Sequence, residues 1–197
     1  SSVGGKTGVD LKSGKNLIGT FHQPKAVIIG RDFLKTLPRK QVTSGLAEII
    51  KCGVIADKSL FEFIEKNQEK IYKLETSAIN FVIEKSLKVK IKIVESDEKE
   101  SANRMLLNYG HTYGHALEKL SNYTLLHGFA ISIGMVIANE MAVTKKLLSK
   151  KDAERIKNLL KLTGLPVTTI KKPQIKDLLS DKKREGNHIN FVLPTKI

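Results

Sequence analysis

The stretch from Arg104 to His115, followed by His127-Gly128, constrains the fold more than any other part of the chain. His111 and His115 are four residues apart, so on a helix they share one face, with Cβ atoms roughly 6 Å apart. Arg104 and Asn108 lie just upstream, where a cation and an amide can bind an anion. Imidazoles at ligand spacing beside these two groups indicate a site for a metal and an anion.

The pair His111 and His115 also has a simpler interpretation, because two histidines at this spacing often lie on a solvated helix by chance. The residue after His111 is Thr112 rather than Glu, which excludes the His-Glu-x-x-His motif of zinc proteases. A metal therefore needs a third ligand from elsewhere, and Glu48 is a candidate because it lies in the apolar segment 46–51. Spacing alone favours His111 with His115 as the ligand pair.

Apolar residues at helical spacing predict a succession of helices. The first begins at residues 36–38, where Thr36 is the predicted cap and Pro38 lies in the first turn. The others are predicted at 59–73, at 76–95, from about 111, at 127–142, at 150–162 and from Pro173.

The two ends of the chain have other patterns. Residues 1–22 are rich in Gly, Ser and Lys and predict a loop, in which Gly4-Gly5-Lys6 can cradle a phosphate or a carboxylate. The apolar run 26–30 predicts a buried strand, and residues 189–193 predict another.

The net charge of +14 raises the question of an anionic partner. We expect no nucleic acid, because the lysines are spread along helices, few aromatic residues interleave with them and the sequence has no nucleic-acid motif. An anionic small substrate and an ordinary solvated surface explain the charge better. We expect no membrane span, since the apolar runs are too short. The single cysteine, Cys52, cannot form an internal disulfide, which suits a reducing cytoplasm.

Together these residues resemble the 3-dehydroquinate synthase family. The matching stretches follow the family's order and spacing over nearly the whole chain, at residues 1–7, 14–16, 23–24, 35–38, 44–51, 97–100, 104–115, 127–128 and 181–183. The resemblance implies a mainly α chain, with a helical metal- and substrate-binding domain at 32–197. Residues 1–31 would be a substrate loop and the end of the N-terminal Rossmann-like domain. Most of that NAD-binding domain would be absent, so we expect the chain alone to be inactive.

The resemblance also implies roles for individual residues. Glu48, His111 and His127 are the implied ligands of a catalytic Zn²⁺ or Co²⁺, which leaves His115 for the phosphate side of the substrate. The residues implied to bind substrate are Lys6, Asn16, Lys51, Lys90, Glu100, Arg104, Asn108, His115, Lys182 and Lys183. Those implied to contact NAD are Lys6, Lys15, Thr36 and Leu37. A homodimer is implied as well.

The implied reaction converts 3-deoxy-D-arabino-heptulosonate 7-phosphate to 3-dehydroquinate and phosphate, the second step of the shikimate pathway to aromatic amino acids. In this reaction NAD takes a hydride from carbon 5, phosphate leaves by elimination, the hydride returns and an aldol closure forms the product ring. The alternatives are another sugar-phosphate cyclase, a metal-dependent polyol dehydrogenase, or a metal-binding domain without catalytic activity.

Four positions leave questions open. Gln41 and Phe129 stand where the family commonly has Glu, and at Phe129 this removes a carboxylate beside the metal. Lys90 lies on the apolar stripe of the helix 76–95, where its side chain either extends to solvent or, as the resemblance implies, faces an anion. His127 is predicted to begin a helix, whose positive end should lower its pKa and favour the neutral imidazole.

Overall fold

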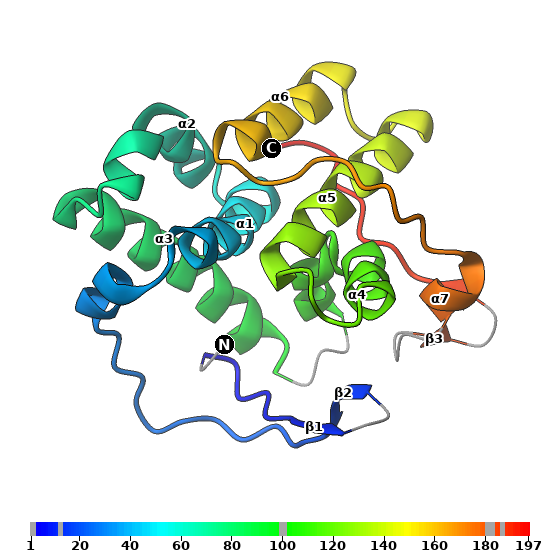
Figure 1. The fold of residues 1–197 in the computed structure, drawn as a ribbon, viewed down its shortest axis with the longest axis horizontal. Helices are drawn as coiled ribbons and strands as arrows, with labels where there is room; N and C mark the ends of the chain where they lie inside the picture. Colours follow the sequence, from blue (N-terminus) through cyan, green and yellow to red (C-terminus); the bar gives the residue numbers. More distant parts are fainter. Residues whose placement is uncertain (1–2, 12–13, 99–101, 180–183, 186–187) are drawn as a thin grey trace.

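The computed structural model of the chain describes residues 3–11, 14–98, 102–179, 184–185 and 188–197 (Figure 1). Most of them are helical, which confirms the mainly α prediction. The α-helices are α1 Arg39–Ala56, α2 Lys58–Tyr72, α3 Thr76–Ser96, α4 His111–Leu120, α5 His127–Thr144, α6 Lys150–Leu162 and α7 Ile175–Leu179. Two 3₁₀ helices are η1 Arg31–Thr36 and η2 Asn103–Asn108. The strands form two antiparallel hairpins, β1 Val9–Leu11 with β2 Gly14–Ile18, and β3 Arg184–Glu185 with β4 His188–Ile189.

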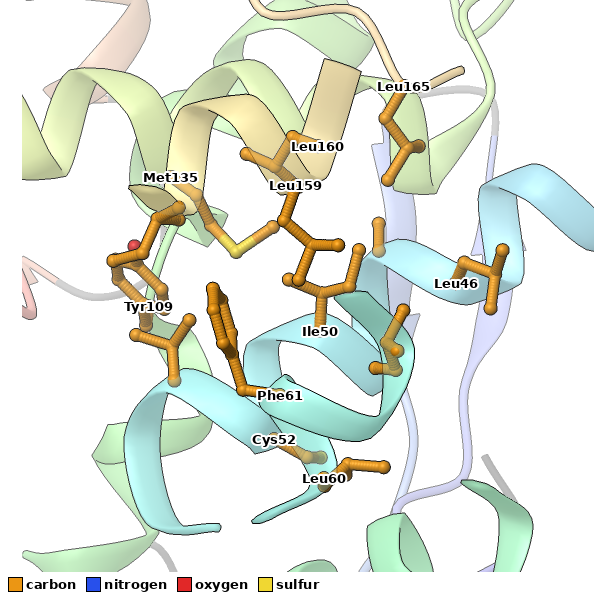
Figure 2. Close-up of a cluster of buried hydrophobic side chains, with 14 of the residues drawn as sticks. Leu46, Ile50, Cys52, Leu60, Phe61, Tyr109, Met135, Leu159, Leu160 and Leu165 are labelled. Carbon is orange, nitrogen blue, oxygen red and sulfur yellow. The ribbon is translucent and has the colours of Figure 1, made fainter. Parts of the chain in front are cut away.

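The main hydrophobic core lies where α1, α2, α5 and α6 meet (Figure 2). Ile50, Phe61, Tyr109, Met135 and Leu159 are among its fully buried side chains. Burying each large apolar side chain stabilises the fold by roughly 1.5–3 kcal/mol relative to leaving it exposed. Helix α5 is buried on most of its surface and packs against α1, α4 and α6, so its apolar residues do not form a single stripe. None of the helices in the described ranges is long and apolar enough to cross a membrane.

Glycines allow α5 to touch its neighbours through the backbone. A Cβ added at Gly128 would lie 1.9 Å from the Ser44 carbonyl oxygen of α1. A Cβ at Gly134 would lie 1.9 Å from the carbonyl oxygen of Gly110, which immediately precedes α4. Since no side chain fits at either point, α1, α4 and α5 are held at backbone contact, and residues at their ends are brought together.

The first long helix begins later than predicted. Thr36 does not cap it but ends η1, where its hydroxyl donates to the Phe33 carbonyl at 3.2 Å. Helix α1 begins at Arg39 with Pro38 at the N-cap position. The reason is that a proline disfavours the helical conformation in the residue before it, and Leu37 is accordingly extended, with φ −79° and ψ 129°.

The predictions for the chain ends need correction. Residues 1–22 are not only loop, since they contain the β1–β2 hairpin. The buried strand predicted at 26–30 is wrong, because this run is not in a strand and Ile28 is 95% exposed. A strand requires a hydrogen-bonded neighbour, and no described residue pairs with this run. Of the strand predicted at 189–193, only Ile189 lies in β4, while Val192 and Leu193 pack against the core instead.

Candidate metal centre

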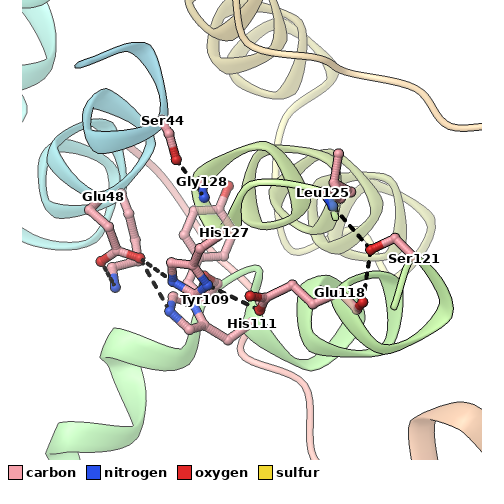
Figure 3. Close-up of polar contacts among 10 residues, drawn as sticks. Ser44, Glu48, Tyr109, His111, Glu118, Ser121, Leu125, His127 and Gly128 are labelled. Atoms are coloured by element: carbon pink, nitrogen blue, oxygen red, sulfur yellow. Dashed lines mark hydrogen bonds and ion pairs between the residues drawn. The ribbon is translucent and has the colours of Figure 1, made fainter. Parts of the chain in front are cut away.

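Three side chains from three helices converge at one point (Figure 3). Glu48 lies in the middle of α1, while His111 and His127 are the first residues of α4 and α5. Glu48 Oε1 lies 3.3 Å from His111 Nε2 and 3.4 Å from His127 Nε2. The candidate ligand atoms of the three residues all lie within 4.8 Å of one another. The structure therefore brings together the three ligands that the family resemblance implies.

The hydrogen bonds behind the two imidazoles orient them for metal binding. His111 Nδ1 lies 3.1 Å from the Tyr109 carbonyl oxygen, and His127 Nδ1 lies 3.0 Å from Glu118 Oε2. Both partners accept hydrogen bonds, so each neutral ring carries its proton on Nδ1 and directs the lone pair of Nε2 towards Glu48. Such hydrogen bonds to the second ring nitrogen are usual behind histidine ligands of metals.

Glu48 presents one carboxylate oxygen to the rings and uses the other elsewhere. Lys51 Nζ donates to Glu48 Oε2 at 2.6 Å and to the Leu107 carbonyl at 2.8 Å. The Lys51 side chain is 4% exposed, so this is no surface ion pair. Glu48 Oε1 is buried and accepts no hydrogen bond from the described part of the chain. A divalent cation fits between this oxygen and the two Nε2 atoms, and three ligands of these types leave an open position, as in catalytic zinc sites.

The charges of the centre follow from its burial and its neighbours. Burial by itself raises the pKa of Glu48, but the Lys51 ammonium and the two imidazoles hold it well below its usual range. Burial, together with the charge of Lys51, lowers the pKa of His111 to about 4. Glu48 is thus an anion and His111 a neutral ligand at neutral pH.

The expectation that the pKa of His127 is lowered is wrong for the protein without bound metal. Burial does lower this pKa, but the hydrogen bond to Glu118 and the nearby Glu48 carboxylate raise it to about 9. Two carboxylates outweigh the positive end of α5, so His127 releases a proton when it becomes a ligand.

His115 lies beside the centre, one turn after His111 on α4. Its ring centroid is 5.3 Å from that of His111 and 6.0 Å from that of His127. Among the described residues, a second group with metal-ligand proximity consists of His115, Glu118 and His127. Neither group contains both His111 and His115, the pair that spacing alone favoured.

Sequence reasoning gave Glu118 no role at this centre. It is buried, and it supplies a carboxylate to His127, whereas Phe129 packs partly buried against the core. A signal was present, because Glu118 follows His111 by seven residues and His115 by three, which places all three on one face of α4.

Arg104 is buried on η2 and connects the N-terminal segment to the helices. Its guanidinium donates to the Gly4 carbonyl at 2.6 Å and to the Glu98 carbonyl. Its backbone amide donates to Asp97 Oδ2 at 3.0 Å. Gly4 is therefore held against the end of α3, and Asn108 follows on η2, partly buried.

Lys90 is half-buried on α3, so its side chain does not simply extend into solvent. Burial lowers its pKa, Glu48 raises it, and the cations Lys51 and Arg104 lower it. The charge of Lys90 therefore interacts with those of Glu48, Lys51 and Arg104.

The remaining residues singled out in the sequence lie elsewhere along the described chain or outside it. Lys6 is exposed in a bridge with Phe21, and its Nζ lies 5.9 Å from the centroid of that ring. Lys15 and Asn16 lie on β2, Thr36 and Leu37 are exposed before α1, and Gln41 is exposed in the first turn of α1. Glu100, Lys182 and Lys183 lie outside the described residues.

Comparison with known proteins shows the same family along the whole chain. The family model for the 3-dehydroquinate synthase C-terminal region matches residues 45–184, and the model for the N-terminal region matches residues 1–44. The boundary between the two models falls within α1, and the division predicted at residues 31 and 32 stays a prediction.

Curated relatives carry the same family name. A 3-dehydroquinate synthase of Prochlorococcus marinus subsp. pastoris is 50% identical over 203 residues, a match that covers 100% of this chain and 56% of the relative. One from Nitratiruptor sp. is 47% identical over 201 residues, again covering 100% of this chain and 56% of the relative. The chain therefore spans just over half the length of these relatives.

Two solved structures share the fold. A 2-epi-5-epi-valiolone synthase from Streptomyces hygroscopicus subsp. jinggangensis, with NAD⁺ and Zn²⁺ bound, matches with a TM-score of 0.90 and 26% identity over 100% of this chain and 56% of its own. A 2-deoxy-scyllo-inosose synthase in complex with carbaglucose-6-phosphate, NAD⁺ and Co²⁺ matches with a TM-score of 0.80 and 27% identity over 98% of this chain and 55% of its own.

Proposed function

The chain belongs to the 3-dehydroquinate synthase family, and we propose that it supplies the metal- and substrate-binding part of an enzyme that makes 3-dehydroquinate. The substrate is 3-deoxy-D-arabino-heptulosonate 7-phosphate, and the second product is phosphate. The observation that carries this proposal is the convergence of Glu48, His111 and His127, in a chain 50% identical to a protein of that name. The proposal applies to a protein that also provides the family's nucleotide-binding region.

Glu48, His111 and His127 hold a Zn²⁺ or Co²⁺ ion in this proposal. When bound, the metal polarises substrate hydroxyl groups as a Lewis acid and NAD accepts and returns a hydride. The protein's own contribution is positional. Lys51 holds Glu48 so that a single carboxylate oxygen faces the imidazoles, and the hydrogen bonds on Nδ1 keep both Nε2 lone pairs directed at the same point.

The cations near the centre bind the two anionic groups of the substrate. Lys51 and Arg104 are buried and Lys90 is half-buried, and charge-assisted hydrogen bonds are strong where water is excluded. Lys51 donates two of its N–H groups, to the Glu48 carboxylate and to the Leu107 carbonyl, so its third N–H is available to a carboxylate or a phosphate. We assign His115 to the phosphate side, because it lies beside the ligand rings and not between them.

The related sugar-phosphate cyclases are the main alternative. The chain is 26% and 27% identical to the valiolone and inosose synthases, against 47% and 50% to the two dehydroquinate synthases. This difference favours the heptulosonate substrate, which carries a carboxylate that the carbaglucose-6-phosphate bound to the inosose synthase lacks.

The test is a substrate panel on the longest natural coding sequence that contains residues 1–197. With NAD and Zn²⁺, phosphate release is measured from 3-deoxy-D-arabino-heptulosonate 7-phosphate, sedoheptulose 7-phosphate and glucose 6-phosphate. We expect phosphate release from 3-deoxy-D-arabino-heptulosonate 7-phosphate alone. The variant His127→Ala should lose this activity, and Glu140→Gln should keep it, because Glu140 is exposed on α5. Turnover of either of the other two sugar phosphates in preference to the first would contradict the proposal.

A further inference from the structure

A buried carboxylate lies behind the metal centre, on the side of the His127 ring away from Glu48 (Figure 3). It belongs to Glu118 on α4, and the side chain is 5% exposed. Glu118 Oε2 lies 3.0 Å from His127 Nδ1. An ionised carboxylate is costly to bury unless it is paired and hydrogen-bonded, so the imidazole and the carboxylate depend on each other.

The packing of α4 against α5 holds this contact in place. A Cβ added at Gly114 would meet Ile131 Cδ1 at 2.6 Å and the Ala130 carbonyl oxygen at 3.2 Å, so the two helices touch closely one turn from Glu118. The turn that joins them is fixed as well, since Ser121 Oγ donates to the Glu118 carbonyl at 2.8 Å and accepts from the Leu125 amide at 3.3 Å. Glu118 and His127 therefore have little freedom to separate.

We propose that Glu118 is a positioning residue, which holds His127 in the tautomer and orientation that direct Nε2 to the metal. This inference rests on the metal centre of the proposed function. A carboxylate only accepts hydrogen bonds, so the proton of neutral His127 stays on Nδ1. The lone pair then lies on Nε2, which is 3.4 Å from Glu48 Oε1.

The partner of His127 differs from that of His111 in charge. His111 Nδ1 faces the neutral Tyr109 carbonyl, whereas His127 Nδ1 faces an anion. A carboxylate behind a histidine ligand increases the basicity of the ligating nitrogen, and removing such a partner weakens metal binding by about 10- to 100-fold. Glu118 thus strengthens one ligand of the centre without touching the metal.

The competing explanation is that Glu118 is itself a ligand. Glu118, His115 and His127 form the second group whose ligand atoms lie within 4.8 Å of one another. In that arrangement zinc binding depends on His115 and is independent of His111. If Glu118 only positions His127, zinc binding depends on His111 and is independent of His115.

The experiment measures the zinc Kd of residues 1–197 by competition with a chromophoric chelator, and the visible absorption of bound Co²⁺. Glu118→Gln keeps the shape of the side chain but removes its charge, and Glu118→Asp keeps the charge but shortens the reach to Nδ1. Glu140→Gln is the matched control, because it removes the same charge from an exposed position of α5, 13 residues after His127 and roughly 20 Å along the helix. Melting in excess chelator reports folding separately.

We expect both Glu118 variants to bind zinc about 10- to 100-fold more weakly and to alter the Co²⁺ spectrum, while Glu140→Gln and His115→Ala leave both unchanged. Wild-type zinc affinity in both Glu118 variants would overturn the inference and leave the metal centre standing. Loss of zinc in His115→Ala with retention in His111→Ala would overturn it in favour of Glu118 as a ligand. A wild-type chain that binds no zinc, or a His127→Ala chain that binds it normally, would instead refute the proposed metal centre.

Discussion

The substitution Gly128→Ala should both destabilise the chain and impair its metal centre. Its Cβ would lie 1.9 Å from the Ser44 carbonyl oxygen and 2.8 Å from Ser44 Oγ, whereas ordinary contact begins at 3.4 Å. To relieve the first contact alone, α5 must move about 1.5 Å away from α1, since 3.4 − 1.9 = 1.5. His127 would move with it, away from Glu48, which lies one turn after Ser44. Zinc ligands must keep their distances within about 0.2 Å, so the three ligands could no longer bind one ion.

The expected loss of stability has two parts. Overpacking of this kind costs about 1–3 kcal/mol. The Gly128 amide also donates to Ser44 Oγ at 3.0 Å, and losing such a cap at a helix N-terminus costs roughly 1 kcal/mol. Together these amount to about 2–4 kcal/mol, or a melting temperature lower by roughly 5–15 °C for a chain of this size. Thermal melts with Zn²⁺ and with chelator measure both effects.

Gly45→Ala is the matched control for this experiment. Gly45 adjoins Ser44 within α1, but it is exposed, and a Cβ added there would meet nothing within 4 Å. Replacing glycine in a helix interior should therefore stabilise the chain by about 0.5–1 kcal/mol and leave zinc binding unchanged. The two Gly→Ala substitutions near Ser44 should thus change the stability of the chain in opposite directions. If Gly128→Ala behaves like Gly45→Ala, backbone contact between α1 and α5 does not position the centre.

Other changes test the site and the fold separately. Zinc at 100 times its Kd should raise the free energy of unfolding by about 2.7 kcal/mol. In thermal melts, His127→Ala should abolish this gain and His115→Ala should keep it. The reverse pattern would contradict the ligand assignment. Burial raises the pKa of Asp57, the N-cap of α2, but hydrogen bonds from the first turn of α2 and the Lys85 ammonium lower it below its usual range. The advantage of wild type over Asp57→Asn in urea unfolding should therefore be complete above about pH 3.9, the unfolded pKa, and be lost as the pH falls through the folded pKa; an advantage that grows in acid would refute this. Lys146 is exposed just after α5 with φ 58°, so Lys146→Gly should raise the melting temperature by roughly 2–4 °C by relieving about 1 kcal/mol of strain, and no gain would show that the strain is absent. Residues 1–197 alone should bind NAD weakly in calorimetry, because the N-terminal family model matches only residues 1–44; tight binding would show that the rest of that region is dispensable.

The helices were predictable from the sequence because their signals are local. The ranges predicted at 59–73, 76–95 and 150–162 correspond to Lys58–Tyr72, Thr76–Ser96 and Lys150–Leu162. An apolar stripe with a period of 3.6 residues and the polar residues at its ends are read within one segment. The start of α1 was missed because the effect of Pro38 on Leu37 outweighed the capping preference of Thr36.

The metal centre was only partly predictable, because it depends on contacts between segments. Spacing on α4 suggested His111 with His115, and the apolar segment around Glu48 made that residue a candidate third ligand. Only the family resemblance chose His127 as a ligand in place of His115. The partner of His127 is Glu118, nine residues earlier and across a turn, and its role depends on how closely α4 packs on α5. The strand predicted at residues 26–30 was wrong for a similar reason, because an apolar pattern does not reveal whether a neighbouring strand is present to pair with it.

The charges of the assembled centre also explain why its ligand should be an anion. The charges of Glu48 and Lys51 cancel, and Glu118 offsets half the charge of a divalent metal. Lys90 and Arg104 then leave the surroundings of the ion positive, and the N-termini of α4 and α5 at the two histidines add to the same sign. Because this charge is partly shielded from water, it is worth more than the same charge on the surface. A sugar that carries a carboxylate and a phosphate balances it, whereas a neutral polyol would leave several cations close together and unpaired.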